Sequence, residues 1–130
     1  MVLSRRQLRG ITALYVCGLL LQGGITLLAR LVPAVDRAAP AILQRTQMIA
    51  PHSLLHVATG LLALWILVKG PTDGPWRFML GFGLIYTTLG VWGAVTDLQL
   101  GLGLQPFDHP IHIVLGGLAL ASAWLGRGAA

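Results

Sequence analysis

The sequence is poor in the charged residues that a water-exposed surface needs. Only 10% of its 130 residues are charged, there are four aspartates and no glutamate, and one cysteine is present. Soluble domains carry about 25% charged residues, and disordered segments are more polar still, so the composition excludes both classes. Cys17 alone provides neither an intramolecular disulfide nor a metal site.

Long apolar runs make up most of the chain. Hydrophobic residues account for 55% of it, and the charges leave four uncharged stretches of 18–23 residues, at 10–29, 46–68, 78–96 and 109–126. A membrane-spanning helix needs about 20 such residues, and its backbone must be hydrogen-bonded internally. We therefore expect an all-α fold, an integral membrane four-helix bundle. It forms a single domain over residues 1–130, with spans at about 10–31, 50–68, 77–96 and 109–126.

The connection between the first two spans is the longest, covering residues 33–49. It contains two prolines and three charged residues. We expect part of it, residues 41–48, to form a short helix lying at the membrane surface.

The basic residues predict the orientation. Four spans put both termini on one side, and this side holds six basic residues against three on the other. Because basic residues concentrate in cytoplasmic loops, we expect both termini in the cytoplasm. The net charge of +5 does not indicate nucleic-acid binding, since no basic stripe is present that could follow a phosphate backbone.

The second and fourth spans look like copies of one another. Residues 56–64 align with 112–120 at an offset of 56, with five of nine positions identical, including His56 with His112. The first and third spans match more weakly, 17–20 with 82–85 and Gly24 with Gly90. We therefore expect two duplicated helix pairs related by an axis along the membrane normal.

Three stretches carry a resemblance to a known family. These are residues 54–62, 77–90 and 108–116, with a His-x-x-x-Gly pattern in spans two and four. They resemble a family of small four-span bacterial membrane proteins of unknown function, over residues 50–126 and loosely in the first span. The resemblance implies four spans and matching histidines at His56 and His112. It implies no activity, and His52 and His109 lie outside the pattern.

All four histidines lie at the N-terminal ends of spans two and four. His52 and His56 are four residues apart, and His109 and His112 are three apart, so each pair shares a helix face. His56 and His112 lie about 6 Å deeper than their partners. Ionisable residues at such depth generally face the bundle interior, and we expect both rings to point inward at equal depth.

Three interpretations of these histidines are open. In the first, His56 and His112 are neutral residues whose rings hydrogen-bond to a backbone carbonyl or to each other. In the second, they are axial ligands of haem or chlorophyll. In the third, a zinc or copper ion binds at an outward-facing site made of His52, His56, His109 and His112. Asp108 could join that site, although we expect it to cap span four.

The sequence lacks the residue patterns of common enzymes. It has no carboxylate pair for acid–base catalysis, no nucleophile elbow and no phosphate-binding loop. The favoured function is therefore non-enzymatic: an accessory or scaffold subunit of a larger membrane complex, such as an electron-transfer or photosynthetic one. The alternative is a haem- or chlorophyll-binding protein that uses His56 and His112. The expected partners are the lipid bilayer and other membrane subunits, in a bacterial inner (plasma or intracytoplasmic) membrane.

The orientation can be tested by labelling the C-terminus. In a Cys17→Ser background, an Ala130→Cys variant should react with a membrane-impermeant maleimide only after the cells are permeabilised, because the basic residues hold this end in the cytoplasm. Labelling of position 130 in intact cells or spheroplasts would contradict the predicted topology.

Overall fold

The computed structural model describes residues 2–96 and 100–129. The described residues form helices and no strand. Four helices are long and apolar enough to cross a membrane, which confirms the all-α four-helix prediction and indicates a multi-pass membrane protein. They are α1 (Arg5–Leu31), α4 (Ala50–Lys69), α5 (Gly74–Thr96) and α6 (Asp108–Gly126), with the short α2 (Pro33–Ala38), α3 (Ala41–Thr46) and the 3-10 turn η1 (Arg127–Ala129).

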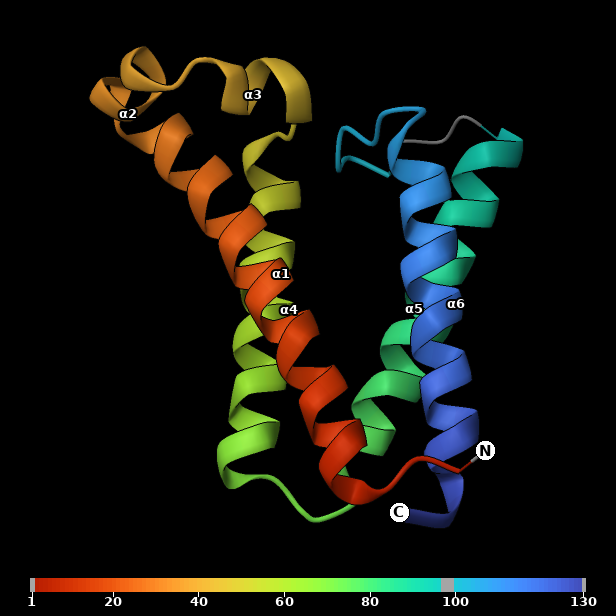
Figure 1. Ribbon diagram of the computed structural model, residues 1–130. Coiled ribbons are helices and arrows are strands. Elements are labelled where there is room, and N and C mark those ends of the chain that lie inside the picture. Colours follow the sequence, from red (N-terminus) through yellow and green to blue (C-terminus); the bar gives the residue numbers. More distant parts are fainter. Residues whose placement is uncertain (1, 97–99, 130) are drawn as a thin grey trace.

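The long helices form two antiparallel pairs (Figure 1). In the first pair α1 packs against α4, and in the second α5 packs against α6. Both termini lie at one end of the bundle, here called the terminus end, and α2 and α3 lie at the opposite end, the histidine end. The pairs meet at the terminus end, where the Leu3 amide donates to the Leu125 carbonyl at 2.9 Å.

Two of the spans begin several residues earlier than the sequence predicts. Helix α1 starts at Arg5 because Ser4 and Gln7 form a capping box, in which the Ser4 hydroxyl accepts from the Gln7 amide and the Gln7 side chain accepts from the Ser4 amide. Such reciprocal bonds satisfy amides that have no partner within the helix. Helix α5 starts at Gly74, ahead of Arg77, whose side chain pairs with Asp73 at 2.7 Å.

The connection 33–49 contains two short helices. The expected helix at 41–48 is observed as α3, which ends at Thr46 and is capped by Gln47 in a left-handed conformation (φ 50°). Helix α2 was not predicted. Arg30 donates to the Met48 carbonyl, and the Met48 side chain is buried. These contacts hold the connection against the end of α1.

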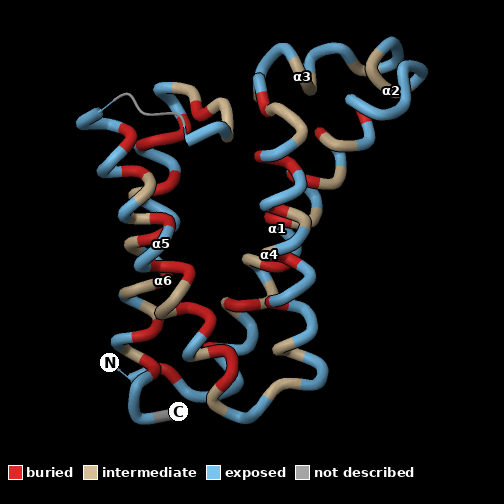
Figure 2. Tube along the Cα trace, turned by 180° about the vertical axis from the view of Figure 1, so that it is seen from behind, coloured by how far each residue is buried: buried red, intermediate tan, exposed pale blue. Residues whose placement is uncertain are grey.

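Exposed and buried residues divide as expected for a bundle in lipid. Buried residues concentrate where helices face one another, and exposed residues cover the outside (Figure 2). Large apolar side chains are among the most exposed, with Leu14 at 71% and Val95 at 79%. In water this large apolar surface would be exposed to solvent at a high free-energy cost. The outer faces are therefore suited to contact with lipid.

Close helix contact within each pair depends on glycine. A Cβ atom on Gly23 of α1 would lie 2.7 Å from the Ser53 carbonyl oxygen of α4. A Cβ on Gly90 of α5 would lie 2.7 Å from the His109 carbonyl oxygen of α6. Small residues at such contacts let two backbones approach closely, which is a main source of helix association in membranes.

These contacts show that the two pairs are built alike. Gly23 faces Ser53 and Val57, whereas Gly90 faces His109 and Ile113, which are the same positions at the offset of 56. Gly23 and Gly90 are 67 residues apart, so the first and third spans correspond at an offset of 67. The predicted matches of 17–20 with 82–85 and of Gly24 with Gly90 are therefore wrong by one or two residues. They relied partly on lipid-facing leucines, whose positions the packing does not constrain.

The role of Gly23 can be tested against its neighbour. A Gly23→Ala variant should have a free energy of unfolding that is lower by about 1–3 kcal/mol, because the added methyl group meets the backbone of α4. A Gly24→Ala variant is the matched control, since a Cβ there has nothing within 4 Å. Reversible unfolding in mixed micelles measures both. Equal stability of the two variants would contradict the packing described here.

Candidate metal centre

Three histidines meet in the interior near the histidine end. His52 and His56 come from α4 and His112 comes from α6, and each side chain is at most 4% exposed. The ring centroids of His52 and His56 are 4.7 Å apart, those of His52 and His112 are 5.9 Å apart, and those of His56 and His112 are 6.5 Å apart. The predicted inward orientation of His56 and His112 is thus confirmed, and the three residues are called the histidine cluster below.

Several nitrogens of this cluster have no hydrogen-bond partner among the described residues. These are both ring nitrogens of His56 and the Nδ1 atoms of His52 and His112. The predicted bonds between rings, or from rings to carbonyls, are therefore not found for these atoms. A buried polar group without a partner costs a few kcal/mol, and hydrocarbon offers no water as a substitute. The cluster is thus suited to a bound ligand.

The spacing of the nitrogens fits a single small ion. One ring nitrogen from each of His52, His56 and His112 can be chosen so that all lie within 4.8 Å of one another. Zinc–nitrogen bonds are about 2.0–2.1 Å long, so two ligands of one zinc ion lie about 3–4 Å apart. Small side-chain rotations close this difference. The cluster can therefore hold a compact ion such as zinc or copper, for which imidazole is a common ligand.

The four-histidine site predicted from the sequence is not assembled. His109 packs its ring against Gly93 of α5, where a Cβ would collide with the ring, and it lies outside the histidine cluster. A helix turns about 100° per residue, so His109 lies about 60° around α6 from His112. His109 therefore faces α5 while His112 faces the cluster. The equivalent of His109 in the first pair is Ser53, whose hydroxyl lies 2.8 Å from that of Thr26 on α1.

Asp108, rather than His109, is the counterpart of His52. Four residues separate Asp108 from His112, as four separate His52 from His56, and the offset of 56 aligns them. Asp108 is the first residue of α6 and makes no capping bond, so its predicted role as N-cap is wrong. Its carboxylate is 5% exposed and accepts from the Gln105 amide at 2.7 Å. The two pairs thus present His–His and Asp–His to the same interior.

A macrocycle fits this arrangement poorly. In a haem with two histidine ligands, the iron lies between the axial nitrogens and the porphyrin surrounds it on all sides. A nitrogen of His52 lies within 4.8 Å of nitrogens of both His56 and His112, which is space that the porphyrin would need. His56 and His112 also face the same interior. Neither can therefore ligate a separate pigment on a lipid-facing surface.

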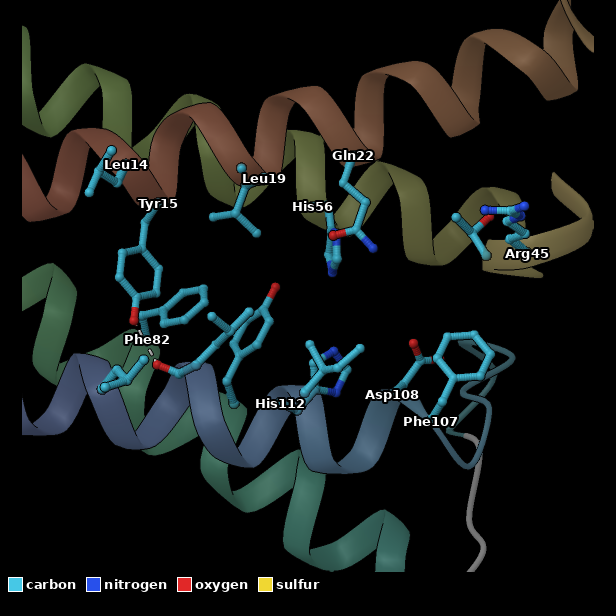
Figure 3. A pocket seen from close by; sticks show the side chains of 16 residues that line it. Leu14, Tyr15, Leu19, Gln22, Arg45, His56, Phe82, Phe107, Asp108 and His112 are labelled. Atoms are coloured by element: carbon cyan, nitrogen blue, oxygen red, sulfur yellow. Dashed lines mark hydrogen bonds between the residues drawn. The ribbon is translucent and has the colours of Figure 1, made fainter. Parts of the chain in front are cut away.

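A cavity of about 440 Å³ adjoins the cluster. His56 and Gln22 line it from the first pair, and His112 and Asp108 line it from the second (Figure 3). Sequence reasoning missed this cavity and the part that Tyr86 plays in it. The Tyr86 ring lies 5.1 Å from the His112 ring, edge to face. The signal for Asp108 was present, since extending the repeat four residues toward the N-terminus aligns it with His52.

Comparisons with protein-family models, curated proteins and solved structures find no match for this chain. The resemblance to the family of small four-span bacterial membrane proteins therefore stays a prediction. The geometry of the histidine cluster and its cavity is accordingly the basis for the proposed function.

The contact between Gly93 and His109 yields a test of the duplication. Gly93→Thr should destabilise the protein by about 1–3 kcal/mol, because the new side chain meets the His109 ring. Adding His109→Ser recreates the Thr26–Ser53 arrangement and should recover most of that loss, giving an interaction energy of about 0.5–3 kcal/mol in a double-mutant cycle. Additive losses, measured by unfolding in micelles, would argue that positions 93 and 109 do not correspond to 26 and 53.

Proposed function

We propose that this protein is a membrane-embedded metal-binding protein in which His52, His56 and His112 bind one zinc or copper ion. The observation that carries the proposal is the meeting of three buried imidazoles, within bonding reach of one ion. The unpartnered nitrogens on all three rings support it further. Deprotonated imidazole nitrogens are lone-pair donors, so an ion would satisfy the groups that the protein leaves unsatisfied.

Charge considerations give Asp108 a part in this site. Three neutral imidazoles leave the charge of a divalent ion uncompensated, and an unpaired charge is costly away from water. Asp108 is buried and lines the same cavity as His56 and His112. We propose that its carboxylate balances the charge of the ion. Three histidine ligands also leave a fourth position for a further ligand, as in catalytic zinc sites.

The position of the site bears on the other predicted functions. A tetrapyrrole at His56 and His112 would require His52 to leave its observed place, so the small ion is the better-supported ligand. The accessory-subunit role is compatible with a bound ion but draws on composition alone. If both termini are cytoplasmic in a bacterial inner membrane, as the basic residues predict, the cluster lies near the periplasmic face and would take its ion from there.

Zinc binding by purified protein tests the proposal. After chelation and dialysis, the protein in lipid nanodiscs should bind one zinc ion per chain. His52→Asn, His56→Asn and His112→Asn should each weaken binding by at least about 100-fold, because removing a ligand costs no less than removing a residue that supports one. The same titration with copper, followed by electron paramagnetic resonance, distinguishes the two metals.

His109→Asn is the matched control. His109 is on α6 and is buried like His112, but it lies outside the cluster, so its loss should leave zinc affinity within about threefold of the wild type, the small effect of a substitution away from the site. Equal weakening by all four substitutions, or no stoichiometric binding of either metal, would overturn the proposal. A Soret band in protein purified from its native membrane would favour the tetrapyrrole instead.

A further inference from the structure

The cavity beside the histidine cluster opens sideways toward the lipid. Leu14 and Gly18 of α1 line one side, and Leu115 and Leu118 of α6 line the other. All three leucines are exposed at the bundle surface, and a Cβ on Gly18 would meet nothing within 4 Å. The opening between α1 and α6 therefore leads from the hydrocarbon layer directly to the cluster. It is called the lateral cleft below.

One wall of the lateral cleft is a continuous row of rings. Tyr15 meets Phe82 edge to face at 5.0 Å, Phe82 stacks on Tyr86 at 3.9 Å, and Tyr86 meets His112 at 5.1 Å. The Tyr15 hydroxyl donates to the Leu115 carbonyl at 2.7 Å, which ties α1 to α6. Such a row offers flat and edge contacts that favour a planar ring.

Apart from the tyrosine hydroxyls of the aromatic row, the polar groups of the cleft lie at its histidine end. There Gln22 is exposed on α1, and its amide group donates to the Met48 thioether at 3.4 Å. A thioether sulfur is a weak acceptor. Figure 3 shows Gln22 directed into the space between the two pairs, across from His112. A primary amide in hydrocarbon needs stronger partners, so a ligand carrying oxygen acceptors would complete this end of the cleft.

The charges at the histidine end of the cleft favour an uncharged ligand. Arg45 and Asp108 both line the histidine end, so a cation and an anion are present together. An anionic headgroup would be attracted by one and repelled by the other. A neutral ring with carbonyl groups avoids this conflict and accepts hydrogen bonds from Gln22. The cavity volume of about 440 Å³ lies within the usual range of small-molecule sites, about 300–1,000 Å³.

We infer that the lateral cleft binds one membrane-soluble quinone, with its ring against the aromatic row, a carbonyl at Gln22 and its tail leaving between α1 and α6 into the lipid. The site is adjacent to the proposed metal centre and shares residues with it, namely His56, His112 and Asp108. The remaining groups belong to the cleft alone: Gly18, Gln22 and the rings of Tyr15, Phe82 and Tyr86. Quinone binding does not require the ion, although a bound ion would lie beside the quinone ring.

Equilibrium binding of decylubiquinone tests the inference. Full-length protein in phosphatidylcholine nanodiscs should bind one molecule per chain, and binding should be measured with and without zinc. Gly18→Leu places a side chain into the opening and should lower the affinity at least about tenfold, as expected when ligand atoms lose their space. Gln22→Leu should lower it by about tenfold through the lost hydrogen bond.

Gly24→Leu is the matched control, because this α1 glycine also has nothing within 4 Å of an added Cβ and does not line the cleft. It should change the affinity by less than about twofold. Retained zinc binding by Gly18→Leu and Gln22→Leu shows that both variants are folded. If Gly18→Leu does not fold, the quinone affinity of Gln22→Leu is compared with that of Gly24→Leu. Equal affinities of these two variants would then overturn the inference.

Several results would overturn the inference: no saturable decylubiquinone binding, equal loss in Gly18→Leu and Gly24→Leu, or displacement by excess phosphatidylglycerol or oleic acid as readily as by quinone. Stoichiometric zinc without quinone binding overturns the cleft and leaves the metal centre. Saturable quinone binding by a protein that binds neither zinc nor copper overturns the metal centre and leaves the cleft.

Discussion

Inside a membrane, a polar group must find its hydrogen-bond partner within the protein. The backbone of this chain meets that requirement through four long helices, and several side chains meet it by bonding to a backbone carbonyl. Thr12 and Thr26 donate within α1, whereas Tyr15 and Trp76 donate to carbonyls of α6. Against this background, the unpartnered nitrogens of the histidine cluster stand out as groups that a ligand would satisfy.

The same environment explains why the molecule consists of two tight pairs and a looser junction. Lipid gives no hydrophobic drive for helices to associate, so close packing must come from small residues. Gly23 and Gly60 serve the first pair, and Gly90 and Gly116 serve the second. Between the pairs, a core that includes Phe78, Phe82 and Tyr86 fills the interior, while the lateral cleft adjoins the histidine cluster. An ion at the cluster would join α4 of the first pair to α6 of the second.

Hydropathy and charge predict much of this fold because they act on long segments. The four spans, the shared side of the termini and the inward histidines all follow from run lengths and from the repeat at an offset of 56. The start of α1 depends on two side chains, Ser4 and Gln7, which hydropathy does not register. The first and third spans were aligned incorrectly because the correct offset of 67 gives only one identical pair between them, Gly23 with Gly90, and both spans contain several other glycines.

The histidine site was only half predictable for a related reason. Residues three and four apart on a helix share a face, so the sequence alone allowed either His109 or Asp108 to accompany His112. The choice depends on where α5 lies, since Gly93 leaves room for the His109 ring and turns it away from the cluster. That is a property of the packing between two helices. The lateral cleft likewise depends on how the pairs are placed, which no local pattern encodes.

The central claim, that three imidazoles from both helix pairs share one ion, is tested most directly by X-ray absorption at the zinc edge of the loaded protein. The account predicts three nitrogen neighbours at about 2.0–2.1 Å, with the multiple-scattering signature of imidazole, and a further nitrogen or oxygen ligand. Loss of one imidazole in His112→Asn but none in His109→Asn would assign the ligands. A zinc ion surrounded by sulfur at about 2.3 Å, or by oxygen with a single imidazole or none, would contradict it.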